Sequence, residues 1–417
     1  MTKYHSTQWL CIAAFVILGT GTVRAQGSPY DVIGFGLPVR TGNATIDAMG
    51  GVGVALEGIR TVNDLNQADW TWLDQARFGA GLRYDYVNAI RAGNSDVQSN
   101  VKFTSASFGA PMWNVIHAAF ALGYEPLTDA SNQMNLYDPL VGTRTYVSRG
   151  GTNLIYGGLA ARPIPAISLG ARLDYISGDI RHLDQVSFID TAAGSGEFER
   201  DYFFNGLRGT FGIQLIGDSL GLRGLTLGAV YSLATNLNST QETIVTPLNT
   251  TLDTTLDVAG VGYYPAALSA GISYHLSRRY RMEADYFSQD FSNAYVYAPH
   301  ATSGDSLLRS SNRIAVGIER LPNVRGEYGT SFGFDRWGLR LGLSYGILPV
   351  NPAGSGVREF ALSGGVGIPI SLESLLNLSI AAGQRIPITS GASPNETFVR
   401  IGADVSFSET WFVPTPQ

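Results

Sequence analysis

The feature that most constrains this chain is a strict alternation of apolar residues with polar residues or glycine. In the run 78–86 the apolar positions are Phe, Ala, Leu, Tyr and Tyr, and the positions between them are Gly79, Gly81, Arg83 and Asp85. The same alternation returns in 169–175, 339–345 and 399–407. Successive side chains of a β-strand point to opposite faces, so each run predicts a strand with one apolar face and one polar face.

Runs of this kind recur often enough to build a whole protein from strands. We count fourteen candidates, with boundaries uncertain by several residues. They lie at 76–87, 100–109, 116–125, 151–162, 167–180, 200–216, 224–235, 258–276, 280–291, 309–321, 336–348, 358–370, 377–387 and 396–412. Most are at least as long as the 9–11 residues that a tilted strand needs to cross a bilayer.

The connections between the runs alternate in length. Short ones such as 163–166 and 277–279 are followed by long polar ones, which we expect to be loops: 127–150, 236–257 and 292–308. Outer-membrane barrels have this asymmetry, with their short turns in the periplasm. A soluble β-sandwich or propeller is the alternative, and neither has a reason to alternate in this way. The segment 322–335 breaks the rule, so either a strand boundary is wrong there or a short turn carries an extension.

Composition agrees with a membrane barrel. Charged residues make up 15 % of the chain, against roughly 25 % in ordinary soluble domains, and glycine is abundant at 50 of 417 residues. No apolar run beyond the N-terminus is long enough to form a spanning helix. We therefore predict an all-β fold: a transmembrane antiparallel β-barrel of about fourteen strands, 76–412. Tyrosines near the strand ends, and Trp411 in the last run, fit the aromatic girdles of such barrels.

Residues 1–25 form a predicted signal peptide, which would place the protein in the bacterial outer membrane. Lys3 precedes an apolar run from Trp9 to Leu18, and cleavage is expected after Ala25. Cleavage removes Cys11, the single cysteine, and leaves 26 basic against 34 acidic residues with one lysine, Lys102. A mildly acidic chain lacks the basic stripe that nucleic-acid binding requires, so no nucleic-acid partner is expected.

Residues 26–75 precede the first clear strand and do not alternate. They are dense in glycine around 34–36 and 49–53, and 63–70 has the pattern of a turn or a short helix. About eight strands already enclose an interior that side chains just fill, so fourteen strands enclose a wider one. We therefore predict that this segment folds back as a plug, or hatch, inside the barrel.

The inward faces of the predicted strands carry charges of both signs, often two residues apart on one strand. Two interpretations stay open: a salt-bridged wall that packs the plug, or a polar conduit that lines a ligand path. The candidate residues are Arg83, Asp85, Arg172, Asp174, Arg208, Glu283, Asp285, Arg313, Glu319, Arg340, Arg400 and Asp404.

Together these features resemble the FadL-like family of outer-membrane transporters for long-chain fatty acids and aromatic hydrocarbons. The stretch 48–55 is similar to the family's glycine-rich hatch, and the candidate hatch residues are Met49, Gly50, Gly51, Gly53, Asn63, Asn66 and Ala68. The chain departs from the family where Asn66-Gln67-Ala68 stands in place of Asn-Pro-Ala. The resemblance implies that substrate binds in an apolar pocket against the hatch and leaves sideways through a gap in the wall.

Two functions follow as expectations. The first is passive uptake of hydrophobic small molecules, with outer-membrane lipid and lipopolysaccharide as surroundings. The second is a PorV-like role, also implied by the resemblance, in which long outer loops bind secretion-system proteins. The Asn/Thr/Asp-rich loops 127–150 and 236–257 favour the second slightly. No enzyme activity, cofactor or metal is expected, because the four histidines beyond the signal peptide have no metal-site spacing and no Gly-x-Ser-x-Gly motif occurs.

Overall fold

The structure is a computed structural model of the whole chain. It describes residues 27–39, 42–91, 93–138, 142–188, 195–246, 254–298, 307–322, 334–371, 374–391 and 393–409. The predicted signal peptide and its cleavage site lie outside these residues, as does Trp411. No helix in the described part of the chain is long and apolar enough to cross a membrane.

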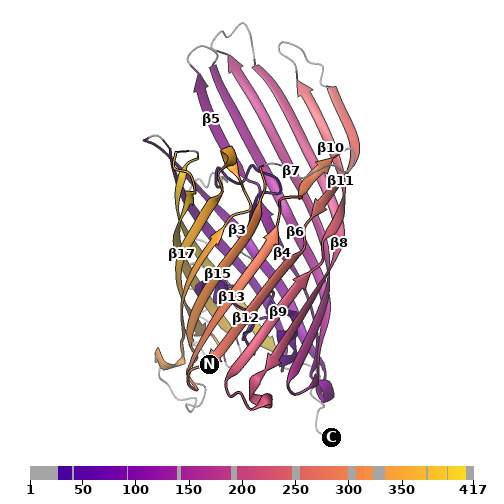
Figure 1. Cartoon of the computed structure of the whole chain (residues 1–417), viewed down its shortest axis with the longest axis vertical. Coiled ribbons are helices and arrows are strands. Elements are labelled where there is room, and N and C mark those ends of the chain that lie inside the picture. The colour runs from indigo at the N-terminus through magenta and orange to yellow at the C-terminus, as the bar shows by residue number, and fades with distance from the viewer. Residues whose placement is uncertain are drawn as a thin grey trace, which may run out of the picture.

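The strands form one closed antiparallel barrel (Figure 1). The last strand pairs with the first of the wall, from Asn395 opposite Ile90 to Glu409 opposite Ala76. The wall has fourteen strand positions, as predicted, because β4 and β5, β9 and β10, β11 and β12, and β13 and β14 each form one interrupted strand, and β1 lies outside the wall. The strands are β1 (Leu37–Pro38), β2 (Ala76–Arg91), β3 (Asn94–Trp113), β4 (Ala118–Asp129), β5 (Asn132–Asp138), β6 (Gly142–Ile164), β7 (Ile167–Phe188), β8 (Ser195–Ile216), β9 (Leu225–Ser232), β10 (Thr235–Thr246), β11 (Thr254–Tyr264), β12 (Ala267–His275), β13 (Tyr280–Asp290), β14 (Tyr295–Ala298), β15 (Ser310–Arg320), β16 (Gly338–Ile347), β17 (Val357–Pro369), β18 (Leu375–Pro387) and β19 (Asn395–Glu409).

The outer surface of the barrel is an apolar belt. Outward positions such as Leu173, Leu207 and Leu341 are exposed, and so are Tyr231 and Tyr345 near strand ends. Such a surface is stable in hydrocarbon and unfavourable in water, which is the exterior expected of a membrane-spanning barrel. The alternation in the sequence thus separates a lipid-facing surface from an enclosed interior.

The short connections gather at one end of the barrel and contain three 3-10 helices: η2 (Asn114–Ile116), η3 (Gly217–Leu220) and η4 (Phe334–Arg336). This end corresponds to the periplasmic end in the sequence analysis. β15 and β16 pair directly, from Arg320 opposite Leu339. The segment 322–335 therefore connects two directly paired strands, which excludes a boundary error; its residues 323–333 lie outside the described residues.

The expectation of long loops is wrong for most of 127–150 and 236–257, whereas in the described part of 292–308 only β14 is a strand. The strands continue past the rim on one side of the barrel and form a projecting sheet, visible at the top of Figure 1. We call this sheet the blade: β5 together with 142–150 of β6, 180–188 of β7, 195–202 of β8, 240–246 of β10 and 254–259 of β11. Polar Thr- and Asn-rich composition indicated loops, but threonine has high β-propensity and cross-strand pairing decided the outcome. Another 3-10 helix, η5 (Pro352–Gly354), lies at the rim.

The N-terminal segment lies inside the barrel, as the predicted fold class requires. Its described parts, 27–39 and 42–75, contain β1, a one-turn helix α2 (Ala44–Ala48) and a 3-10 helix η1 (Gln67–Trp72). Asn43 caps α2 by accepting a hydrogen bond from the Ile46 amide at 3.1 Å. Asn66 likewise caps η1 by accepting from the Ala68 amide at 3.0 Å. We call this segment the hatch.

Candidate functional site

The hatch backbone packs directly on glycines of the barrel wall. A Cβ at Gly342 would lie 2.1 Å from the Met49 carbonyl carbon, and one at Gly228 would lie 2.2 Å from the Val54 carbonyl oxygen. Either distance is far shorter than a Cβ contact can be, so only glycine admits the hatch there. The hatch backbone approaches as closely at Gly170 and Gly317, and hatch side-chain atoms of Asn66 and Ala48 do so at Gly212 and Gly365. These six residues, which we call the glycine belt, explain part of the chain's high glycine content.

Two acidic side chains of β13 hold the glycine-rich stretch of the hatch. Asp285 accepts hydrogen bonds from the amides of Gly53 at 2.8 Å and Val54 at 3.0 Å. Glu283 accepts one from the Ala55 amide at 2.7 Å. Because these three amides belong to no strand or helix, secondary structure supplies no acceptor for them. The wall carboxylates accept their hydrogen bonds instead, as buried N–H groups require.

Arginines of the wall hold hatch carbonyls in the same way. Arg313 donates to the carbonyls of Gly50 at 3.0 Å and Gly51 at 2.9 Å. Arg172 donates to the Asp64 carbonyl at 3.1 Å. A guanidinium offers several donors in a fixed fork, so one side chain satisfies more than one carbonyl.

The other candidate charges pair mainly with one another. Asp174 lies between Arg172 at 2.8 Å and Arg208 at 2.9 Å. The remaining contacts are Arg83 with Asp85 at 2.7 Å, Arg340 with Glu319 at 2.8 Å, Arg400 with Glu359 at 3.4 Å, and Asp404 with the Ala44 amide and with Asn377 at 2.9 Å. Two polar cavities beside Arg83 have volumes of about 30 and 20 Å³, the scale of one or two water molecules. No group of three His, Cys, Asp or Glu in the described residues could hold a metal ion.

The candidate hatch residues are all buried and tie the hatch together. Asn63 donates to the Gly53 carbonyl at 2.9 Å, and Asn66 donates to the Val54 carbonyl at 2.6 Å. Asn66 also reaches the wall at the Ile213 carbonyl, 3.2 Å away. The two asparagines therefore join the glycine-rich stretch to η1.

Several interior residues were missed by sequence reasoning. Arg281, Glu359, Arg385 and Glu396 occupy inward positions and form ion pairs, for example Arg385 with Glu396 at 2.8 Å. They lie near the ends of the predicted runs 280–291, 358–370, 377–387 and 396–412, so applying the period-two pattern to the full length of each run would have found them.

The outer part of the lumen is apolar and is filled by the start of the hatch. Phe35 makes edge-to-face contacts with Phe204, at 5.5 Å between ring centres, and with Tyr264, at 5.2 Å. Tyr30 and Leu37 belong to the same buried cluster, which reaches across the lumen to Leu308 and Val357. The segment 30–37 thus occupies the largest apolar part of the interior.

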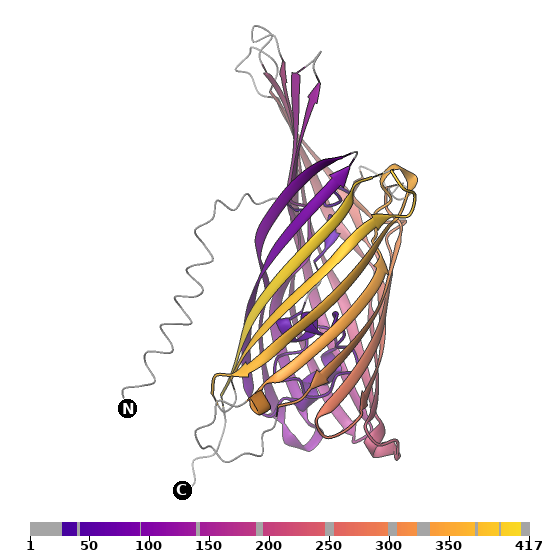
Figure 2. The same ribbon diagram turned by 90° about the vertical axis from the view of Figure 1, so that its left-hand side faces the viewer.

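The wall is interrupted beside this cluster. β3 pairs with β4 only between Ala106 and Trp113, and among the described residues no ladder joins the two strands beyond Ala106. The free edge of β4 takes β1 instead, with Leu37 opposite Asp129 and the Val39 amide donating to the Leu127 carbonyl at 2.8 Å. Figure 2 shows the β2–β3 pair, in indigo, leaning away from the strands that continue upward. We call this interruption the seam.

One side chain bridges the seam from inside. Lys102 of β3 forms ion pairs with Asp129 of β4 and, at 3.2 Å, with Asp85 of β2. On the other face of β3, the ring of Phe103 lies 5.7 Å from that of Tyr124 of β4. Lys102 therefore joins β3 and β4 in the part of the wall where, among the described residues, no backbone ladder joins them.

One carboxyl group in the hatch, that of Glu57, is expected to make the stability of the folded protein depend on pH. Burial, together with the smaller effect of the nearby Asp69 carboxylate, raises the pKa of Glu57 to about 7. The folded state therefore binds this proton more tightly than the unfolded chain, so the free energy of unfolding falls as pH rises from about 4.5 through about 7.

We expect a higher urea midpoint at about pH 5 than at about pH 8, and a smaller difference in Glu57→Gln. Glu242→Gln, in the blade, is the matched control; an unchanged difference in Glu57→Gln would contradict the assignment.

This arrangement defines a class: fourteen-stranded barrels of the FadL type, with a hatch in the lumen. Solved structures with this fold include the Ralstonia pickettii toluene transporter TbuX, with 15 % identity, TM-score 0.61, and 88 % of this chain and 98 % of that chain covered. The Pseudomonas putida toluene transporter TodX has 17 % identity, TM-score 0.60, and coverage of 90 % and 99 %. A Pseudomonas aeruginosa FadL homologue has 12 % identity, TM-score 0.59, and coverage of 89 % and 99 %. At these identities the likeness concerns the fold.

Within that class the sequence belongs to the BamG family, whose profile matches residues 1–415. No curated protein matches the sequence significantly.

Proposed function

We propose that this protein is an outer-membrane barrel for the passive uptake of hydrophobic small molecules, either long-chain fatty acids or aromatic hydrocarbons. The seam carries the proposal. The hatch and the glycine belt close the axial route, while the wall is interrupted beside the apolar cluster at Phe35. An apolar solute that enters from outside would leave through the seam into the bilayer, where its transfer is favourable.

The structural neighbours support this substrate class. TbuX and TodX are toluene transporters, and CymD is a monoaromatic hydrocarbon channel. The packing of the lumen also sets a requirement for the passage of a solute. Because the segment 30–37 fills the apolar space beside the seam, passage requires this segment to move away from β4.

A disulfide across β1 and β4 tests the proposal. Pro38 and Thr128 are directly opposed in the antiparallel pair, where Cα atoms lie roughly 4.5–5.5 Å apart, within disulfide range. We expect Pro38→Cys/Thr128→Cys to take up labelled toluene or oleate only after reduction, with oxidised uptake falling to the rate of cells that lack the gene. Each single cysteine variant is the control. Equal uptake by cells with and without the gene would refute transport, whereas uptake through the locked barrel would refute the required movement.

A second candidate function is a PorV-like interaction role, favoured by the blade. A sheet normally buries one apolar face against another layer. The blade face that continues the lumen wall presents Met134, Tyr146, Phe198 and Leu256, and among the described residues no layer covers it. Arg144 lies 4.4 Å above the Tyr146 ring and Arg200 lies 4.7 Å above the Phe198 ring. A protein partner with apolar and acidic side chains would complement this face.

Purification from native outer membranes separates the two functions. We expect Tyr146→Ser/Phe198→Ser to lose a stoichiometric protein partner while hydrocarbon uptake is kept, because the changes lie outside the lumen. Leu183→Ser, on the opposite face of the blade, is the matched control. A barrel that purifies without any protein partner would count against the interaction role.

A further inference from the structure

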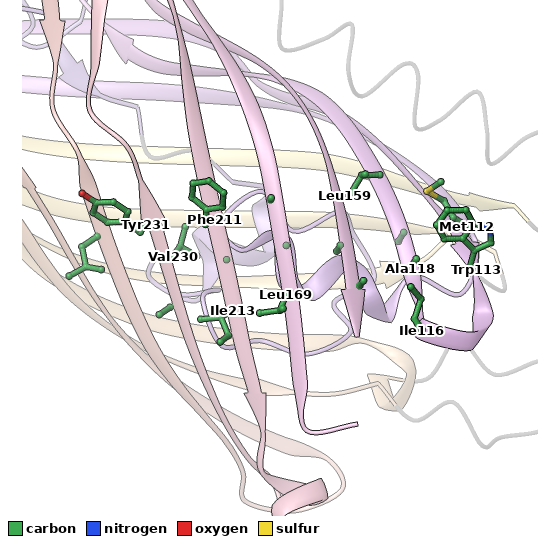
Figure 3. Close-up of a pocket in the computed structure, with 18 residues that line it drawn as sticks. Met112, Trp113, Ile116, Ala118, Leu159, Leu169, Phe211, Ile213, Val230 and Tyr231 are labelled. Atoms are coloured by element: carbon green, nitrogen blue, oxygen red, sulfur yellow. The ribbon is translucent and has the colours of Figure 1, made fainter. Parts of the chain in front are cut away.

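An apolar hollow lies on the outer surface of the barrel, away from the seam and the lumen (Figure 3). Its volume is about 640 Å³, within the range of ligand pockets. It begins beside the periplasmic turn between β3 and β4, at Met112 and Trp113, and extends across β6, β7 and β8 to Tyr231 on β9. None of its lining residues is charged.

The register of the wall explains why the surface is hollow here. Four outward residues lie directly opposite one another on successive strands: Leu159, Ala171, Phe211 and Tyr231. Ala171 is the only small residue among them, so the space beside the Phe211 ring is left open. The adjacent row has small residues at Ala161 and Ala229 as well.

The hatch lies directly behind the hollow. Gly170 and Gly212 belong to the glycine belt and stand in the wall beneath the hollow. A Cβ at Gly170 would lie 2.5 Å from the Gln67 carbonyl carbon, and one at Gly212 would lie 2.2 Å from the Asn66 side-chain oxygen. The strands therefore lie directly against the hatch residues Asn66 and Gln67 behind the hollow, and the two glycines in its floor leave no side chain to fill it.

The position of the hollow decides what can fill it. Its mouth opens on the lipid-facing surface, where water and soluble ligands do not reach. An unfilled void would leave the lining atoms without dispersion partners, so an alkyl chain is the natural occupant. At the turn, Trp113 is 63 % exposed and Val115 is 94 % exposed, which places an amphipathic indole at the level of the lipid headgroups.

We propose that the hollow binds one phospholipid of the periplasmic leaflet, with an acyl chain along Ala171 and Phe211 and the headgroup beside Trp113. The periplasmic turn at one end commits the site to a lipid whose headgroup lies on that side of the membrane. The hollow thus differs from the uptake route, which lies in the lumen and at the seam. The two proposals can fail separately.

Native mass spectrometry of the purified full-length barrel in mild detergent tests this site. We expect one phospholipid to remain bound per barrel, and palmitoyl-oleoyl phosphatidylethanolamine to rebind after delipidation. Ala171→Phe should lower the retained fraction about tenfold, because the ring occupies the space of several methylene groups. Ala403→Phe is the matched control, since it adds the same ring to the lipid-facing surface of β19, away from the hollow. Heat-shifted gel mobility verifies folding, and Ala161→Leu serves in place of Ala171→Phe where that variant does not fold.

The result that overturns the proposal is equal phospholipid retention in Ala171→Phe and Ala403→Phe, or a wild-type barrel that carries no phospholipid. Retention of a free fatty acid in place of a phospholipid also overturns it, because the hollow would then belong to the uptake route. Loss of uptake with retention unchanged would leave the lipid site standing.

Discussion

Replacing Gly342 by leucine is expected to turn a closed barrel into an ion-conducting pore. The hatch peptide between Met49 and Gly50 lies so close to Gly342 that a Cβ there would be 2.1 Å from the Met49 carbonyl carbon. The backbone of β16 cannot retreat without breaking its ladders with β15 and β17, so the hatch has to move. We expect single-channel current to rise about tenfold or more over the wild type, since fourteen strands enclose a bore much wider than side chains fill.

The matched control for this variant is Gly157→Leu. Gly157 faces outward on β6, and a Cβ there meets nothing within 4 Å. The same substitution there should leave the current at the wild-type level. A silent Gly342→Leu barrel with normal heat-shifted mobility would mean that the hatch accommodates the side chain, contrary to the packing described above.

Lys102→Met is expected to give the largest loss of stability among substitutions at the seam. The change removes the cation between Asp85 and Asp129 and leaves the Asp129 carboxylate buried without a charge partner. Removing one member of a buried ion pair costs about 3 kcal/mol or more. Backbone hydrogen bonds do not compensate, because among the described residues no β3–β4 ladder extends past Ala106. Unfolding in guanidinium, followed by tryptophan fluorescence, measures the change.

The double variant Lys102→Met/Asp129→Asn distinguishes an ion pair from simple loss of packing. When both charges are removed no carboxylate stays uncompensated, so we expect more than half of the lost stability to return. Additive losses in the two single variants would show that Lys102 and Asp129 act independently. Labelling of a Ser105→Cys reporter by maleimide should also be faster in Lys102→Met, because the seam is then held less tightly.

The barrel itself could be predicted because the pattern that specifies its strands is visible in neighbouring residues of the sequence. Whether a side chain such as Leu173 faces lipid and its neighbour Arg172 faces the interior follows from a period of two, which adjacent residues display. For the same reason the inward charged positions could be read directly from the strands, and the residues missed near the strand ends follow the same pattern. Each of the fourteen expected strands coincides with one strand position of the wall.

The blade could not be predicted in this way. Segments such as 240–246 are mostly polar on both faces and place Ile244 and Val245 side by side, so alternation is weak and the composition resembles that of a loop. They are strands because β8 and β11 lie on either side and satisfy their backbone groups. The pairing partners in β8 lie about 40 positions away in the sequence, so the segment 240–246 alone does not show that it will form a strand.

The glycine belt, the seam and the hollow belong to the tertiary structure for a related reason. Sequence alone determined that this chain has two kinds of face, enough strands to close a wide barrel and an N-terminal segment that could fill it. Only the closed structure decided which wall positions meet the hatch, where β3 separates from β4, and where the outer surface is hollow. A close approach between two backbones depends on distances across the barrel, and no short stretch of sequence contains them.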